Sequence, residues 1–443
     1  MTTQRSFSRQ LSLDAQASKA QPAIPLHLWP MLVFAVAALL PRELAVSIGG
    51  AVLFPYRLVL LTLIPWIAVR LLVRPLQLTG FDALAALITF WLTIALVARE
   101  PFAIALEAGA ALSLDFALAY LLGRISFTCT NDFRAAFNAL LPVLGLVALV
   151  QMIESIGHEQ ILRPFFAELF AQPPPSIHDE ARFGLYRAAG PFQHPILGGV
   201  FMAATLPMAW LLTPSGWKRV AAIAIACAMI FTVSASAILS FAVCLVLLGT
   251  VWLQQRTGWP FWLIGASSAL VVLLLILAIS ETGPLNFAAR RLSISVQTGY
   301  WRVFIWEYAG AEALRNPLFG IGFGEWARPH WMLSSSIDAH FLFWSVRFGL
   351  IAGLGFLLMV LGAAVRIAVR SRYQTERAKL VSLSIAISLA GFAAAGFSVS
   401  FWEGILGWLT LLCGAAISLS NLPQGRSYSL PGQPTNLEAL SVR

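Results

Sequence analysis

Apolar runs of roughly 20 residues recur along most of the chain, and this repetition limits its fold more than any other feature. A helix rises about 1.5 Å per residue, so such a run crosses the hydrocarbon core of a bilayer, about 30 Å thick. Backbone polar groups find no partners in lipid, which restricts spanning segments to helices or closed barrels. The runs are continuous and rich in Leu, Ala and Val rather than alternating. They therefore predict an all-α integral membrane protein.

Composition agrees with this fold class. The chain is 59% hydrophobic and 11% charged, whereas ordinary soluble domains carry about 25% charged residues. This excludes a soluble globular enzyme. The net charge of +9 indicates topology and contact with anionic lipid or pyrophosphate groups, and nucleic acid is not an expected partner.

The runs predict about twelve transmembrane helices. Two long loops, 154–194 and 280–340, interrupt their succession. We place one polytopic transmembrane domain over 29–420, between disordered cytoplasmic tails at 1–28 and 421–443. The predicted spans are 29–53, 57–74, 81–98, 102–123, 137–153, 195–213, 219–233, 236–253, 260–279, 341–365, 380–398 and 402–420.

Short basic links set the expected orientation, because Lys and Arg in short loops mark the cytoplasmic side. With twelve spans these links share one side, and both long loops lie on the other, which is the periplasm in a Gram-negative cell. The links contain Arg70, Arg74, Arg124, Arg134, Lys218, Arg219, Arg256, Arg366, Arg370, Arg372, Arg377 and Lys379.

Charged residues inside the apolar runs lead to two further predictions. Glu107 and Asp115 lie in the fourth span, and we expect both to face the bundle interior because charge in lipid is costly. Pro41, Arg42 and Glu43 interrupt the first run and predict a helix followed by a re-entrant piece.

The large loop concentrates charged residues in a chain that has few, so we take it as the default functional site. It contains Arg290, Arg291, Arg302, Arg315, Arg328, His330, His340, Glu307, Glu312, Glu325 and Asp338. The histidines lack metal-ligand spacing, and the four cysteines are scattered, so we expect no metal site and no disulfide framework.

Four stretches carry a family resemblance. They are RAAGPFQHP at 187–195, GYWRVFIWE at 299–307, NPLFGIGFGEW at 316–326 and SSIDAHFLFWSVRFGLIAG at 335–353. With the twelve-span layout they make the chain resemble the O-antigen ligase and polysaccharide polymerase superfamily of membrane glycosyltransferases.

The resemblance implies a GT-C-like helical bundle in the bacterial inner membrane, with its active site facing the periplasm under the large loop. It implies a metal-independent, inverting transfer without a cofactor. The donor would be an undecaprenyl-pyrophosphate-linked glycan, and the acceptor another glycan or lipid A core. Membrane lipid, a chain-length regulator and a flippase are the further candidate partners.

Pyrophosphate departure needs cations, and arginine binds phosphate oxygens bidentately while staying charged. Our candidates are Arg187, Arg290, Arg291 and Arg302, with His194 beside them. An attacking hydroxyl benefits from a base, for which we take His340 or Asp338. Arg302, His340 and Asp338 form the predicted catalytic group.

Two departures from the family pattern matter. Relatives carry a His-Asn pair about eleven residues before a glycine, where this chain has Asp338-Ala339 before Gly349. Asp338 would otherwise cap the following helix. Relatives also carry Ser-Arg in the stretch TVSASAILS at 232–240, which has no arginine here.

Alternatives remain open. The motifs favour a polysaccharide polymerase over a ligase only through the altered His-Asn position, and a small-anion transporter is the alternative from another class. Gly320, Gly322 and Gly324 predict a tight turn rather than a phosphate cradle. The tryptophans of the large loop favour packing or an interfacial belt over sugar stacking.

Overall fold

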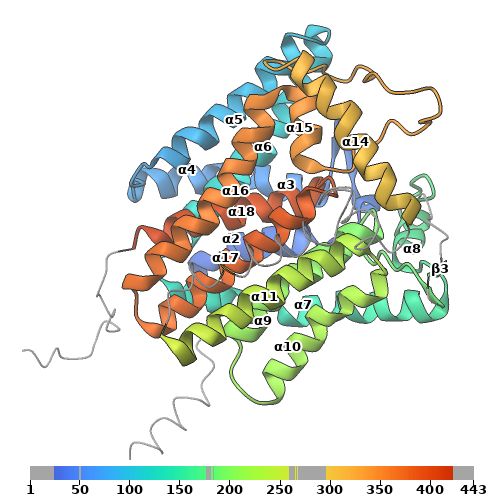
Figure 1. Ribbon diagram of the computed structural model, residues 1–443. Helices are drawn as coiled ribbons and strands as arrows, with labels where there is room; N and C mark the ends of the chain where they lie inside the picture. Colours follow the sequence, from blue (N-terminus) through green and yellow to red (C-terminus); the bar gives the residue numbers. More distant parts are fainter. Residues whose placement is uncertain are drawn as a thin grey trace, which may run out of the picture.

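The computed structural model describes residues 24–48, 51–175, 181–182, 184–258 and 296–422, and the isolated positions 265 and 267. It is a bundle of helices with two short hairpins (Figure 1). The predicted ninth span at 260–279 lies outside the described residues, apart from those two positions.

The N-terminal region is broken where the sequence predicted it. Helix α2 (Trp29–Ala37) ends before Pro41, and a 3₁₀ turn (Arg42–Leu44) leads into the antiparallel hairpin β1 (Val46–Ile48) and β2 (Ala51–Leu53). Helices α3 (Pro55–Thr62) and α4 (Ile64–Val73) then meet at a bend of 42°. Pro65 lies at this bend, where its missing N–H interrupts the helical hydrogen bonds.

Long apolar helices build the rest of the bundle. They are α5 (Gly80–Val97), α6 (Phe102–Ser126), α7 (Thr130–Gly157), α9 (Pro195–Leu212), α11 (Ala235–Thr257), α16 (Leu350–Arg370), α17 (Glu376–Gly396) and α18 (Glu403–Ser420). Helices α9, α17 and α18 are buried along most of their length, and α18 packs against α6. They form the centre around which the lipid-exposed helices pack (Figure 1).

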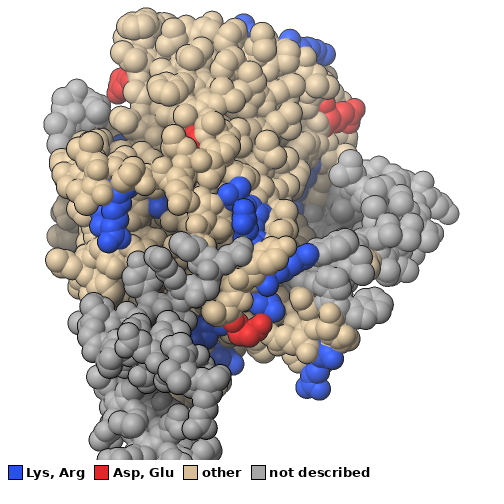
Figure 2. Space-filling view, turned by 90° about the vertical axis from the view of Figure 1, so that its left-hand side faces the viewer, with Lys and Arg blue, Asp and Glu red and all other residues tan. Residues whose placement is uncertain are grey.

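The bundle has two chemically different ends. At one, which we call the basic end, Arg124 pairs with Asp82 at 2.8 Å, and Arg366 donates to Asn421 at 2.7 Å. At the other, the loop end, Trp306 of the large loop donates to Phe397 at 3.0 Å, and Arg99 donates to Asn316 at 3.0 Å. Figure 2 shows a group of mostly Lys and Arg side chains beside a broad surface that is almost uncharged.

The described residues do not confirm the count of twelve spans. Among the described residues, eight helices are long and apolar enough to cross a membrane, or nine if α3 and α4 form one bent span. The predicted first span contains only the short α2, and the seventh is α10 (Trp217–Cys227) with a 3₁₀ turn (Ala228–Thr232). The tenth is divided into α15 (His340–Phe348) and α16.

The two intramembrane acids behave differently. Asp115 is 8% exposed and pairs with Arg57 at 2.7 Å, as expected for an interior carboxylate. The prediction for Glu107 is wrong, because its side chain is exposed in the second turn of α6. Its position near the loop end allows the carboxylate to reach the interface instead of the bundle interior.

The large loop contains a helix, α14 (Val296–Arg315), which packs against α15. Trp326 and Ile305 belong to a small apolar core there, and Trp331 contacts Trp301 and Phe304, so the packing interpretation of the tryptophans is confirmed. The first long loop contains α8 (Leu162–Leu169) and a hairpin of β3 (Ala181–Arg182) and β4 (Leu185–Tyr186).

The glycine run forms a turn that closes on α15. Ile321 N–H donates to Val346 O at 2.8 Å, and Gly322 N–H donates to Arg347 O at 3.0 Å. Gly320 has φ 64°, where a Cβ would meet Val346 O at 2.4 Å. Two backbone N–H groups of the glycine run therefore donate to carbonyl groups of α15. The predicted tight turn is confirmed.

Close packing of α6 on α18 generates a stability prediction. A Cβ at Gly123 would lie 2.1 Å from Leu411 O, which is backbone and cannot move aside. We expect Gly123→Ala to destabilise the protein by roughly 1–3 kcal/mol, measured as a lower thermal midpoint in detergent. The control is Gly249→Ala, where a Cβ would meet no described atom within 4 Å. Equal midpoints for both variants would contradict this packing.

Candidate functional site

Arg302 organises a polar cluster at the loop end. It projects from α14 and donates through Nη2 to Ser236 Oγ at 3.2 Å, and Ser236 Oγ lies 3.0 Å from Ser398 Oγ. Burial lowers the pKa of Arg302, the Asp338 carboxylate opposes this shift, and the Arg182 guanidinium adds to it. The Asp338 carboxylate and the Arg182 guanidinium, from two other segments, therefore both act on the Arg302 guanidinium.

The start of α11 forms the floor of this cluster. Val233 adopts φ 44°, a left-handed conformation that a β-branched residue rarely takes. Ser234 then caps α11 by accepting from Ala237 N–H at 3.5 Å. This is the stretch that lacks the arginine found in relatives. Arg302 reaches Ser236 there, so α14 places a guanidinium beside the stretch.

The 187–195 segment approaches the same floor. Ala188 N–H donates to Phe231 O at 3.1 Å, which fixes Arg187 next to the 3₁₀ turn Ala228–Thr232. Arg187 is 4% exposed. Two predicted pyrophosphate ligands, Arg187 and Arg302, are thus held by segments that meet at the start of α11.

Glu154 holds this segment in place. Its fully buried carboxylate accepts from four backbone N–H groups. Oε2 accepts from Ala189 at 3.2 Å and Gly190 at 2.7 Å, while Oε1 accepts from Ile161 at 3.2 Å and Leu162 at 3.3 Å. The last turn of α7 is therefore tied to both ends of the first long loop.

His340 lies in an aromatic cage at the start of α15 and is fully buried. Its ring lies 5.3 Å or less from the rings of Trp344, Phe356 and Phe401. Nδ1 accepts from Phe401 N–H at 3.0 Å, which leaves the proton of the neutral imidazole on Nε2. Nε2 has no hydrogen-bond partner among the described residues.

Asp338 differs from His340 in both respects. Its side chain is exposed and accepts from Ser336 Oγ at 2.5 Å. The alternative that Asp338 caps the following helix is wrong, because Ala339 occupies the N-cap of α15 and no described side chain caps it.

The remaining predicted ligands are a histidine and two arginines. His194 caps α9, since its Nδ1 accepts from Ile196 N–H at 3.1 Å. Arg290 and Arg291 lie outside the described residues. No group of three His, Cys, Asp or Glu side chains suited to a metal ion occurs in the described part of the chain.

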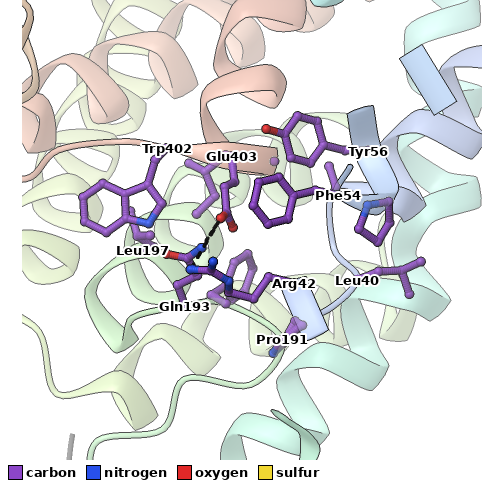
Figure 3. A pocket seen from close by; sticks show the side chains of 14 residues that line it. Leu40, Arg42, Phe54, Tyr56, Pro191, Gln193, Leu197, Trp402 and Glu403 are labelled. Carbon is purple, nitrogen blue, oxygen red and sulfur yellow. Dashed lines mark hydrogen bonds and ion pairs between the residues drawn. The ribbon is translucent and has the colours of Figure 1, made fainter. Parts of the chain in front are cut away.

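Sequence reasoning missed a hollow beside the cluster. It is lined by Arg42, Gln193 and Glu403 together with Trp402 and Tyr56, and Gln193 Nε2 donates to the Glu403 carboxylate (Figure 3). The available signals were weak. Glu403 is a lone acid at the start of an apolar run. Gln193 stands within the 187–195 motif, in which arginine and histidine are the more obvious candidates.

The anchoring role of Glu154 leads to a prediction. In Glu154→Gln the amide –NH2 replaces an oxygen that accepts two N–H groups, and each orphaned donor costs about 1–3 kcal/mol. We expect faster hydrogen exchange at residues 187–190 or at 161–162. Glu159→Gln, at an exposed site just after the end of α7, is the matched control. Unchanged protection in both segments would show that the carboxylate does not hold them.

Comparison with known proteins agrees with these motifs. The O-antigen ligase family model matches residues 220–357, a segment that runs from α10 into α16 and contains Arg302, Asp338 and His340. Arg187, His194 and the hollow-lining Glu403 lie outside the matched segment. No curated protein matches the chain. The resemblance to the O-antigen ligase family is confirmed over residues 220–357, and the apolar helices are those of a multi-pass membrane protein.

Proposed function

We propose that this protein transfers glycan from an undecaprenyl-pyrophosphate donor at the periplasmic face of the bacterial inner membrane, most simply as a polysaccharide polymerase. The observation that carries the proposal is Arg302, which donates to Ser236 Oγ at 3.2 Å inside the segment that the O-antigen ligase family model matches, and whose guanidinium is acted on by Asp338 and Arg182. The loop end is then the periplasmic end, and the basic end faces the cytoplasm.

The reaction divides between a leaving group and a nucleophile. As the anomeric C–O bond breaks, the pyrophosphate departs with the electron pair and gains negative charge. Guanidinium groups fixed beside it stabilise that charge more in the transition state than in the ground state, which lowers the barrier. Arg302, Arg187 and Arg182 supply such groups, and Arg290 and Arg291 are further candidates from the same loop. The inverting course expected from the family places the acceptor hydroxyl on the opposite face of the anomeric carbon.

The acceptor proton needs a base, and the environments favour Asp338 over His340. Asp338 is exposed, and its carboxylate acts electrostatically on the Arg302 guanidinium. His340 already uses Nδ1 as an acceptor, so its neutral ring offers a donor rather than a lone pair. We assign His340 a positioning role and His194 the capping of α9.

The alternatives differ in acceptor or in class. A ligase acting on lipid A core would use the same donor cluster, and the altered His-Asn position is the observation that favours a polymerase. For a transporter, intramembrane ionisable residues should line a pathway, but Asp115 is paired with Arg57 and Glu107 is exposed. These positions favour the transferase.

The first test targets the leaving-group cation. We expect Arg302→Ala to lower the rate of glycan transfer by about 10²-fold or more, because a preorganised positive group is lost. The measurement is transfer from a lipid-pyrophosphate glycan in vitro, scored for chain growth and for lipid A modification. Arg315→Ala, at an exposed position on the same helix, should keep full activity. Undiminished transfer by the Arg302 variant would show that Arg302 does not stabilise the leaving group.

The second test separates the two candidate bases. Asp338→Asn should lower turnover about 10²–10⁴-fold with little change in the KM for the donor. His340→Gln keeps an acceptor for Phe401 N–H and should retain measurable turnover at reduced thermal stability. If His340→Gln instead loses more turnover than Asp338→Asn, the imidazole is the base.

A further inference from the structure

The hollow missed by sequence reasoning brings charged, amide and aromatic side chains together at one opening. It opens to solvent, and its free space of about 380 Å³ includes the solvent at its mouth. Its walls come from residues 38–42, 54–56, 191–197 and 402–405. Figure 3 shows Arg42, Gln193 and Glu403 converging at its centre, with the Trp402 ring to one side and Phe54 and Tyr56 on the other.

The charges of this region balance. Arg42 lies 3.8 Å from Glu403 in the hollow itself. Directly behind, Arg57 pairs with Asp115 at 2.7 Å, and the buried Arg163 pairs with Glu43 at 2.6 Å. Each guanidinium has its own carboxylate, in contrast to the Arg302 cluster with two guanidinium groups and one carboxylate. A pyrophosphate has no electrostatic reason to prefer the hollow, whereas an uncharged ligand does.

The groups that remain available suit a polyhydroxyl ligand. The Glu403 carboxylate accepts hydrogen bonds, the Arg42 guanidinium donates them, and the Gln193 amide does both. Trp402 is 37% exposed and, with Phe54, supplies aromatic surface at the hollow. Sugar hydroxyls both donate and accept, and the C–H face of a pyranose ring packs on an aromatic plane.

Backbone strain marks Glu403 itself. It adopts φ 54°, a left-handed conformation unfavourable for a residue with a side chain. Gly404 explains how the strain is held, because a Cβ there would lie 2.3 Å from Ala38 O. Helix α18 therefore begins in direct contact with the backbone after α2. That contact fixes the Glu403 side chain at the hollow, where Gln193 and Arg42 meet it.

Two short segments connect the hollow to the Arg302 cluster. The first runs from Arg187, near the start of α11, to Gln193 in the hollow. The second runs from Ser398, hydrogen-bonded to Ser236, to Glu403. Ser398 and Glu403 are five residues apart, at most about 18 Å when fully extended, and Arg187 and Gln193 are six residues apart, at most about 22 Å. The hollow therefore lies within these distances of residues beside the Arg302 cluster.

From this arrangement we propose that the hollow binds the terminal sugars of the acceptor glycan as a neutral-carbohydrate subsite, with Glu403 and Gln193 hydrogen-bonding its hydroxyls and Trp402 packing on a ring face. That the bound sugars belong to the acceptor rests on the proposed glycosyl transfer. Sugar binding by the hollow does not depend on it.

The test uses the full chain in lipid nanodiscs with two probes. Neutral trisaccharides of glucose, galactose or mannose report on the hollow, and inorganic pyrophosphate reports on the Arg302 cluster. Binding is measured by saturation-transfer NMR for the sugars and by calorimetry for pyrophosphate. The variants are Glu403→Gln, Trp402→Ala and Arg302→Ala, with Glu325→Gln at a fully exposed loop-end site as control.

The wild type should bind at least one trisaccharide saturably. Glu403→Gln should weaken that binding about tenfold or more by removing a charged acceptor, and Trp402→Ala should also weaken it, while both keep pyrophosphate binding. Arg302→Ala should show the reverse pattern. Wild-type failure to bind any of the trisaccharides, or equal sugar binding by Glu403→Gln, would overturn the subsite. If the wild type shows this binding pattern but transfers no glycan, the proposed function is overturned and the sugar site remains.

Discussion

The loop end depends on one buried carboxylate. Glu154 has no exposure to water, and its two oxygens together accept from four backbone N–H groups that would otherwise be unsatisfied. A buried charge is tolerable when hydrogen bonds replace its hydration. These hydrogen bonds fix the shape of the loop, and they also replace the hydration of the Glu154 carboxylate. Ser155 adds a bond to Tyr186 O at 2.8 Å, so two consecutive residues of α7 support the segment that carries Arg187 and Gln193.

Two of the four non-glycine residues with positive φ in the described part of the chain lie at the proposed sites. Val233 lies at the floor of the Arg302 cluster, and Glu403 lies at the hollow. Each strained residue costs free energy of order 1–3 kcal/mol and persists only where its surroundings fix it. Around Val233 the surroundings include the cap by Ser234 and the contact between Phe231 and Ala188. Around Glu403 they are the close approach of Gly404 to Ala38. The rigid bundle thus imposes the geometry of both sites.

Much of the fold could be predicted from apolar periodicity, and most of the site could not. The long spans from 81–98 to 137–153 match α5, α6 and α7 because hydropathy alone decides their existence. Gly349 divides the predicted tenth span because it takes φ 89° with Leu318 O against it, a tertiary contact that leaves no mark on hydropathy. Arg302 and Asp338 could be chosen from the density of charge in one loop. Glu403 and Glu154 could not, because their importance comes from which distant backbone each one meets.

The surroundings of His340 suit a structural role. Its backbone N–H donates to Val399 O at 3.0 Å, and its ring accepts from Phe401 N–H. These two bonds clamp the short segment that connects Ser398 to Glu403, and the aromatic cage prevents the ring from turning. An imidazole used in this way cannot also take a proton through Nδ1. Under the proposed transfer the base lies elsewhere, and our candidate, Asp338, is two residues away and exposed outside the cage. The proposed base and the proposed leaving-group cation then share one electrostatic environment, because the Asp338 carboxylate acts on the Arg302 guanidinium.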